Sequence, residues 1–314
     1  MIGAEDGRLG VGLSVFTAVA WGISPMFMAS VGRRIGSQPT NLLRALLAAL
    51  GLAGVVLPVY WVCRGGHVAM PGAGQCGWLI ASGTVGMVIG DACFYEALVL
   101  LGPRRAVKMN TLAPVVGVLV GWLALHEALG PWALAGCGLV IGAVMYATFA
   151  NTTATPGAVT IEPGAMSALG LVCGLISAVC IGLGSVLGRE AYKTAAATPL
   201  DPIAATVVRV GAAAATLWAI ALARGRAGRA LGFLKDPAVR VRIACGTVFG
   251  PLVGMLGFVS ALKFAPAGLV STIISTSPLV ILPLMAVKYR MRVGVGIIVA
   301  GVLAVVGVGL ISWK

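Results

Sequence analysis

The sequence predicts an all-α integral membrane protein with ten transmembrane helices, arranged as two inverted five-helix repeats. Hydrophobic residues make up 59% of the 314 residues and charged residues only 10%, whereas a soluble globular protein carries about 25% charged residues. The apolar runs are long enough for helices, since a spanning helix needs about 20 apolar residues. An internal duplication completes the evidence for this fold class.

The duplication is clearest between residues 82–121 and residues 246–285, where small residues and prolines match in order. Self-similarity at one fixed separation indicates that the chain contains two copies of one structural unit. The pairs that share this separation are Gly90 and Gly254, Ala97 and Ala261, Leu98 and Leu262, and Pro114 and Pro278.

Each copy holds five apolar runs, and this odd number decides how the copies are oriented. The first repeat covers residues 1–150, a linker rich in Thr, Pro and Gly covers 151–164, and the second repeat covers 165–314. With five spans each, the second copy enters the membrane from the opposite face, an arrangement that supports alternating access. The expected helices are about 10–31, 41–62, 77–100, 107–125, 131–149, 165–188, 203–223, 241–263, 267–287 and 293–313.

The net charge of +13 predicts a membrane orientation and no nucleic-acid partner, because the Lys and Arg residues lie between apolar runs. Six of them lie on the side of the N-terminus and fourteen on the other side. The positive-inside rule then places both termini outside the cytoplasm. We expect a multi-pass protein of the plasma (inner) membrane, with a small-molecule solute and membrane lipids as partners. A homodimer is compatible with the sequence.

The seven cysteines are scattered and show no spacing typical of a metal site or a disulfide framework, so we expect neither a metal nor a cofactor. Glycine is abundant, and GxxxG spacing predicts close helix packing in lipid. The glycine pairs with this spacing are Gly117 and Gly121, Gly138 and Gly142, Gly170 and Gly174, Gly184 and Gly188, and Gly250 and Gly254.

Asp91 is the strongest functional candidate, since it lies about 21 Å along its expected helix from residue 77. An acid at this depth is costly, and such residues are usually functional. Tyr95 follows at i+4 and shares its face. We expect Asp91 either to carry a coupling proton or to form a structural pair with an arginine. Glu96, on another face, is expected to reach the interface or a basic residue of the following loop.

Arg44 and Arg209 occupy matching positions in the second helix of each copy. Inversion places them toward opposite faces, as a gate or an anion clamp requires, whereas the alternative is interfacial anchoring. Trp21, close to Pro25, is expected either to form a cavity wall, because a proline opens helix hydrogen bonding beside a site, or to pack between helices.

Several polar residues lie where a span should be apolar, and they either bind solute or join helices by hydrogen bonds. They are Asn110 and Thr111 in the fourth helix, and Ser271, Thr272, Ser275, Thr276 and Ser277 in the ninth. Glu127 is expected to stabilise the start of the fifth helix, whose dipole favours an acid there.

In its ordered motifs the chain resembles the drug/metabolite transporter superfamily, in its ten-helix branch with two EamA-type repeats. The resemblance covers nearly the whole chain and implies secondary transport of amino acids, metabolites, sugars or drugs. Two departures are the absence of a second-copy counterpart of Glu127 and the predicted outside termini, which the family usually keeps in the cytoplasm. The residues that carry the resemblance are Ala20-Trp21-Gly22, Pro25, Arg44, Tyr95-Glu96-Ala97-Leu98, Pro114, Glu127, Arg209, Ala261-Leu262 and Pro278.

Two other classes of function have less support in the sequence than a non-enzymatic transporter. An ion channel or divalent-cation transporter calls for rings of carboxylates or carbonyl-rich loops, and two acids in one helix are thin support for it. A membrane-embedded lipid-modifying enzyme needs clustered acids or histidines, and the sequence contains no such cluster. A secondary transporter of small organic solutes, with proton coupling through Asp91 as an option, is the favoured interpretation.

Overall fold

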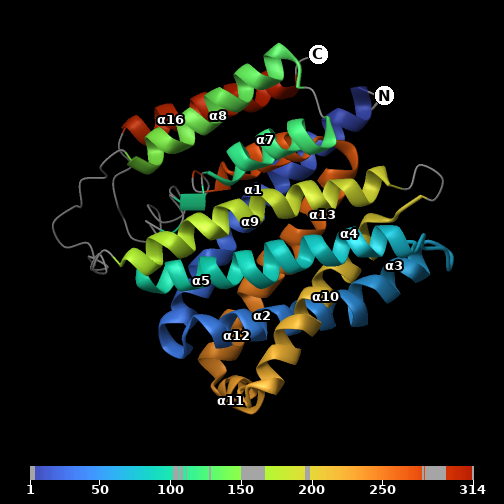
Figure 1. Cartoon of the computed structure of the whole chain (residues 1–314), viewed down its shortest axis with the longest axis vertical. Helices are drawn as coiled ribbons and strands as arrows, with labels where there is room; N and C mark the ends of the chain where they lie inside the picture. Colours follow the sequence, from blue (N-terminus) through green and yellow to red (C-terminus); the bar gives the residue numbers. More distant parts are fainter. Residues whose placement is uncertain are drawn as a thin grey trace.

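The structure is a computed structural model, and all regular elements in its described residues are helices (Figure 1). Six helical segments are long and apolar enough to cross a membrane, and three shorter helices are also apolar. The protein is therefore a multi-pass membrane protein. The described residues are 4–101, 106, 109–110, 112–126, 129–149, 167–194, 199–277, 279 and 295–312.

The helices follow the expected runs closely, although three of the long spans are broken by a π-helical turn. The first repeat contains α1 (Ala4–Ile35), α2 (Ser37–Gly51), η1 (Leu52–Val56), α3 (Leu57–Cys63), α4 (Ala73–Gly83), η2 (Thr84–Gly90), α5 (Asp91–Leu100), α7 (Ala113–Leu125) and α8 (Pro131–Phe149). The second contains α9 (Ala168–Lys193), α10 (Pro202–Ala223), α11 (Ala227–Gly232), η3 (Phe233–Lys235), α12 (Pro237–Thr247), η4 (Val248–Gly254), α13 (Met255–Phe264), α14 (Ala267–Ile274) and α16 (Val295–Ser312).

Two spans, α10 and α12, begin slightly earlier than hydropathy alone indicates, because an acidic N-cap and a proline start the helix. The carboxylate of Asp236 accepts a hydrogen bond from the Ala238 backbone N at 2.9 Å. Asp201 does the same for Ile203 N at 2.8 Å. An acidic N-cap followed by proline at the first helical position favours helix initiation. The expected ninth helix begins as α14, and its second half lies largely outside the described residues, so the count of ten remains a prediction.

The matching second spans of the two repeats run antiparallel, as expected of inverted repeats. Tyr60, at the end of the first of them, donates from its hydroxyl to Asp201 Oδ2 at the start of α10, at 2.8 Å. At the other end, Arg226 Nη1, which follows α10, donates to Gln38 Oε1 of α2 at 2.8 Å. The start of each of these two spans is thus hydrogen-bonded to residues at the end of the other.

The repeats interlock reciprocally rather than packing as separate bundles. The first span, α1, lies against α12, η4 and α13, and its match α9 lies against α4, η2 and α5. Three further pairs join matching helices, α2 with α10, α7 with α14, and α8 with α16. Figure 1 shows α8 and α16 side by side at one edge of the molecule. The interior between the repeats is therefore lined by both copies.

Glycines permit this close packing, although not all of the expected pairs take part. A Cβ on Gly250 would lie 2.6 Å from Ser24 Oγ, and one on Gly254 would overlap Trp21, so the expected tight approach of this helix is confirmed. Gly138 and Gly142 have no described neighbour within 4 Å, and for them the packing prediction is wrong. Gly136 is the glycine of α8 that packs closely, because its Cβ would lie 2.6 Å from the backbone O of Gly307 in α16.

Two π-helical turns occupy matching positions in the third span of each repeat. They are η2 and η4, which end directly before Asp91 and Met255. Single π turns within α-helices occur frequently at functional sites. Their matching positions indicate that the distortion belongs to the repeated unit.

Candidate functional site

Arg44 and Asp91 form an ion pair between α2 and α5. Arg44 Nη2 lies 2.5 Å from Asp91 Oδ2, and the two side chains are only 7% and 18% exposed. The same nitrogen donates to Asn41 Oδ1 at 2.9 Å, and the guanidinium carbon lies 5.3 Å from the centre of the Tyr95 ring. We call Asn41, Arg44, Asp91 and Tyr95 the ion-pair cluster.

The ion-pair cluster lies well inside the hydrophobic part of the bundle. Arg44 is seven residues, or about 10 Å, from the start of α2, and Asp91 is about 14 Å from the end of α5. A single charge there is costly, and removing one partner of a buried pair commonly costs about 3–5 kcal/mol. The structure thus pairs Asp91 with a helix-borne arginine, which was one of the two roles expected for it.

Arg209, the match of Arg44, has different partners. Its Nη1 donates to Ser82 Oγ at 2.5 Å and to the backbone O of Gly184 at 3.2 Å. The guanidinium carbon lies 5.0 Å from the centre of the Phe258 ring, and the residue is 3% exposed. Among the described residues no carboxylate forms an ion pair with it, and its Nε is buried without a hydrogen-bond partner.

Three glycines make room for the Arg209 side chain. A Cβ on Gly188 would lie 2.9 Å from Arg209 Nη1, and one on Gly86 would lie 3.1 Å from Nη2. A Cβ on Gly83 would overlap the Arg209 backbone oxygen. Because glycine alone lacks this atom, α4, η2 and α9 can close around the guanidinium group. We call Gly83, Gly86 and Gly188 the glycine cradle.

The two halves make the same interhelical hydrogen bond with donor and acceptor exchanged. Ser82 Oγ of α4 donates to the backbone O of Gly184 in α9 at 2.5 Å. In the other half, Ser24 Oγ of α1 donates to the backbone O of Gly246 in α12 at 2.8 Å. In the alignment of the two repeats Gly246 corresponds to Ser82. The same contact between helices is therefore made in both halves, but by different residues.

The asymmetry between the halves concerns charge. The residue that matches Asp91 is Met255, which directly follows η4 as Asp91 follows η2. Arg44 therefore has a carboxylate partner, whereas Arg209 has serine, a backbone carbonyl and an aromatic ring.

Trp21 joins the repeats. Its Nε1 donates to the backbone O of Gly250 at 3.2 Å, and its ring centre lies 5.4 Å from that of Phe258. Since Phe258 also contacts Arg209, Trp21 belongs to the wall around the second arginine.

The other expected polar residues lie apart from the two arginines. Asn110 Oδ1 accepts from Ser177 Oγ at 3.3 Å, which joins two helices. Ser275 and Thr276 donate to backbone oxygens of their own segment at 2.6 and 2.7 Å. Ser271 instead reaches Ser185 of α9, with 2.9 Å between their hydroxyl oxygens.

Some expected residues have other surroundings, or none that the structure describes. Glu96 Oε2 accepts from Ser37 Oγ at 2.6 Å, at the start of α2. Within the described part of the chain, no group of three or more His, Cys, Asp or Glu side chains is placed to hold a metal ion. Thr111, Glu127, Pro278 and the basic residues expected to meet Glu96 lie outside the described residues.

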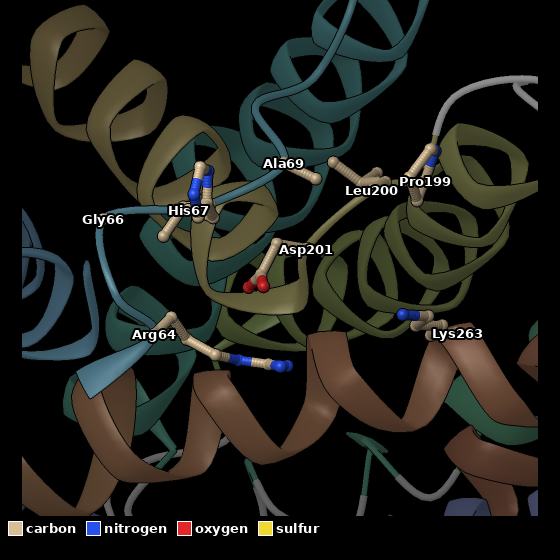
Figure 2. Close-up of a pocket in the computed structure, with 9 residues that line it drawn as sticks. Arg64, Gly66, His67, Ala69, Pro199, Leu200, Asp201 and Lys263 are labelled. Carbon is tan, nitrogen blue, oxygen red and sulfur yellow. The ribbon is translucent and has the colours of Figure 1, made fainter. Parts of the chain in front are cut away.

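A cavity of about 520 Å³ opens at the end where α3 stops and α10 starts (Figure 2). Sequence reasoning missed it, because its charged residues looked like ordinary loop charges. The signals were the acidic N-cap before Pro202 and basic residues at the ends of two neighbouring spans. The lining residues are Arg64, Gly66, His67, Val68, Ala69, Pro199, Leu200, Asp201 and Lys263.

Hydrogen bonds organise one side of this cavity. Arg64 Nε donates to the Tyr60 hydroxyl oxygen at 2.9 Å, and that hydroxyl donates to Asp201. The hydrogen bond from Arg64 to Tyr60 raises the pKa of the Arg64 side chain, so it stays charged. In Figure 2, Arg64, Asp201 and Lys263 extend into the space from three different elements.

Comparison with known proteins identifies the family. A model of the EamA-like transporter family matches residues 8–149 and again residues 168–313, which correspond to the two repeats. A crystal structure of another protein is similar in fold, with a TM-score of 0.66 and 21% identity over 96% of this chain and 95% of that chain. A search of curated proteins found no match. The chain belongs to the EamA-like transporter family, whose members are generally membrane transporters of small solutes.

Proposed function

We propose that the protein is a secondary active transporter of the plasma (inner) membrane that moves a small organic solute by alternating access. The observation that carries this proposal is the different state of two matching arginines. Arg44 of α2 is ion-paired, whereas Arg209, at the matching position of α10, has no carboxylate partner among the described residues. Each of two inverted repeats can take up the conformation that the other has, and when the two repeats exchange conformations the binding site opens to the opposite face of the membrane.

Asp91 is proposed to couple this exchange to protons. If Arg44 takes up the arrangement that Arg209 has in this structure, Asp91 loses its partner while it remains in apolar surroundings. An unpaired buried carboxylate binds a proton rather than stay charged. Tyr95, one turn along the same face, contacts Arg44 and would remain beside the acid.

Transport by purified protein in proteoliposomes tests the proposal. Uptake from a panel of amino acids, sugars and other metabolites is measured with and without a proton gradient. Asp91→Asn should abolish gradient-driven accumulation and retain solute exchange, and Asp236→Asn, in the surface pair with Arg34, is the matched control. Full accumulation in Asp91→Asn rejects proton coupling, and no uptake by the wild type of any solute rejects transport.

Because Asp91→Asn leaves Arg44 buried without a carboxylate, it is measured beside the double variant Arg44→Gln/Asp91→Asn. The double variant removes both charges and so avoids an unpaired one. Loss of accumulation in a stable double variant attributes the defect to the missing carboxyl group and not to unfolding. No observation specifically favours an ion channel or divalent-cation transporter.

A further inference from the structure

The cavity beside α10 has more free positive than negative charge. Asp201 is the one acid among its described lining residues, and both carboxylate oxygens already accept hydrogen bonds, from Ile203 N and from the Tyr60 hydroxyl. Arg64 uses its Nε on Tyr60, while Lys263 Nζ lies 5.5 Å from the centre of the Phe264 ring. Among the described residues neither cation is in an ion pair.

A second unbalanced cation lies deeper on the same side of the bundle. Arg209 is seven residues inside α10, the helix that Asp201 caps, and its buried Nε has no acceptor. A further buried donor is Tyr192, near the end of α9. The Tyr192 hydroxyl is buried and also lacks a hydrogen-bond partner.

These unmet donors call for an acceptor that the described protein does not supply. A guanidinium group can bind a carboxylate or phosphate with two parallel hydrogen bonds, and such charge-assisted bonds are about twice as strong as neutral ones. Displaying two cations around a cavity also raises the local concentration of anions. Its volume of about 520 Å³ lies within the usual range for small-molecule sites.

From this arrangement we infer that the cavity is a docking site for a small organic anion, the transported solute, on its way to or from Arg209. The inference rests on the proposed transport function and adds the chemical class of its substrate. The anion bears a carboxylate or phosphate group, which Arg64 and Lys263 bind at the mouth. Arg209 Nε is buried in this state, so the anion reaches it only when the helices around the glycine cradle separate.

Thermal unfolding of the full-length protein in delipidated detergent micelles tests the docking site. Sodium succinate and sodium phosphate are titrated against sodium chloride at equal ionic strength, with succinamide as the uncharged analogue of succinate. Succinate or phosphate should raise the melting temperature saturably, and succinamide should not. Lys263→Gln and Arg64→Gln should each raise the half-saturating concentration about tenfold, the loss expected for one charge-assisted hydrogen bond.

Lys235→Gln is the matched control, because Lys235 is an exposed cation outside the cavity whose loss changes net charge equally. It should leave the titration unchanged. Identical melting curves in succinate, phosphate and chloride overturn the inference, and so does an equal loss of response in Lys235→Gln. If added phosphatidylglycerol abolishes the response to both anions, a lipid headgroup occupies the cavity, and the solute assignment is wrong.

The outcomes separate this inference from the proposed function. Gradient-driven uptake of neutral solutes that is unaffected by Arg64→Gln and Lys263→Gln would overturn the anion site and leave transport standing. A saturable anion response without any uptake in proteoliposomes would reject transport and retain a binding site. Arg64 directly follows its span, whereas Lys263 lies in the last turn of α13, so the folding of both variants is checked by their melting temperatures in chloride.

Discussion

Replacing Gly188 by alanine should lower the stability of the protein. Compared with a glycine-to-alanine change in an open position, it measures what close packing in the glycine cradle contributes beyond helix propensity. The new Cβ would lie 2.9 Å from Arg209 Nη1, 3.0 Å from Leu262 Cδ1 and 3.1 Å from Ser82 Oγ. Overpacking of this kind costs about 1–3 kcal/mol. Loss of a hydrogen bond made by a charged group costs about 1.5–3 kcal/mol.

Alanine also has a benefit, since it favours a helix over glycine by about 1 kcal/mol. The net expectation is a fall of about 1.5–5 kcal/mol in the free energy of unfolding, obtained from these terms. Gly211→Ala is the control, because Gly211 lies in α10 beside no described atom within 4 Å. It should keep the propensity gain and be neutral or stabilising.

The assay is unfolding of both variants in mixed detergent micelles by increasing the fraction of a denaturing detergent. Transport by the folded fraction is measured beside it. Equal unfolding free energies for Gly188→Ala and Gly211→Ala would refute the reasoning, because close packing around Arg209 would then have no energetic consequence. A destabilised Gly188→Ala protein with unchanged solute exchange would limit the cradle to a structural role.

Three further predictions follow from the contacts described. Asp91→Asn alone should lower the free energy of unfolding by about 3–5 kcal/mol, and Arg44→Gln/Asp91→Asn should lower it by less; equal losses would deny the pair any mutual dependence. A cysteine in place of Gly228 in α11 should resist a membrane-impermeant label in intact cells, and ready labelling would place this segment outside the cytoplasm. Trp21→Phe should cost about 1 kcal/mol through the lost hydrogen bond to Gly250, and an unchanged melting temperature would contradict that bond.

Much of the architecture was predictable because the chain repeats itself and each copy has an odd number of apolar runs. Matching positions alone put Arg44 and Arg209 at equivalent places in an antiparallel pair of helices, and the four-residue helix spacing put Tyr95 on the same face as Asp91. These inferences need only periodicity and order. The transport class, likewise, follows from motifs that occur in a fixed sequence along the chain.

Other features depend on contacts between distant segments and could not be predicted. Two arginines at equivalent positions look alike in the sequence, yet among the residues that the structure describes only Arg44 meets an acid, because Met255 stands where the second acid would be. The cavity could not be predicted either, because its lining comes from distant parts of the chain. Arg64 belongs to the first repeat and Lys263 to the second, and the sequence does not say which helix ends meet. The π turns were missed because no composition distinguishes them from the α-helix that surrounds them.

The paired π turns η2 and η4 have a consequence for how this chain tolerates changes in length. An α-helix has 3.6 residues per turn, so one residue more or fewer rotates everything beyond it by about 100°. A π turn closes over one residue more than an α turn, so deleting one residue from η2 would restore an ordinary helix and leave Asp91 and Tyr95 facing Arg44. Deleting one residue from α4 has no such turn to absorb it within that helix and would rotate Asp91 and Tyr95 away from Arg44. The two π turns are therefore the places where these spans can change length without breaking the contacts beyond them.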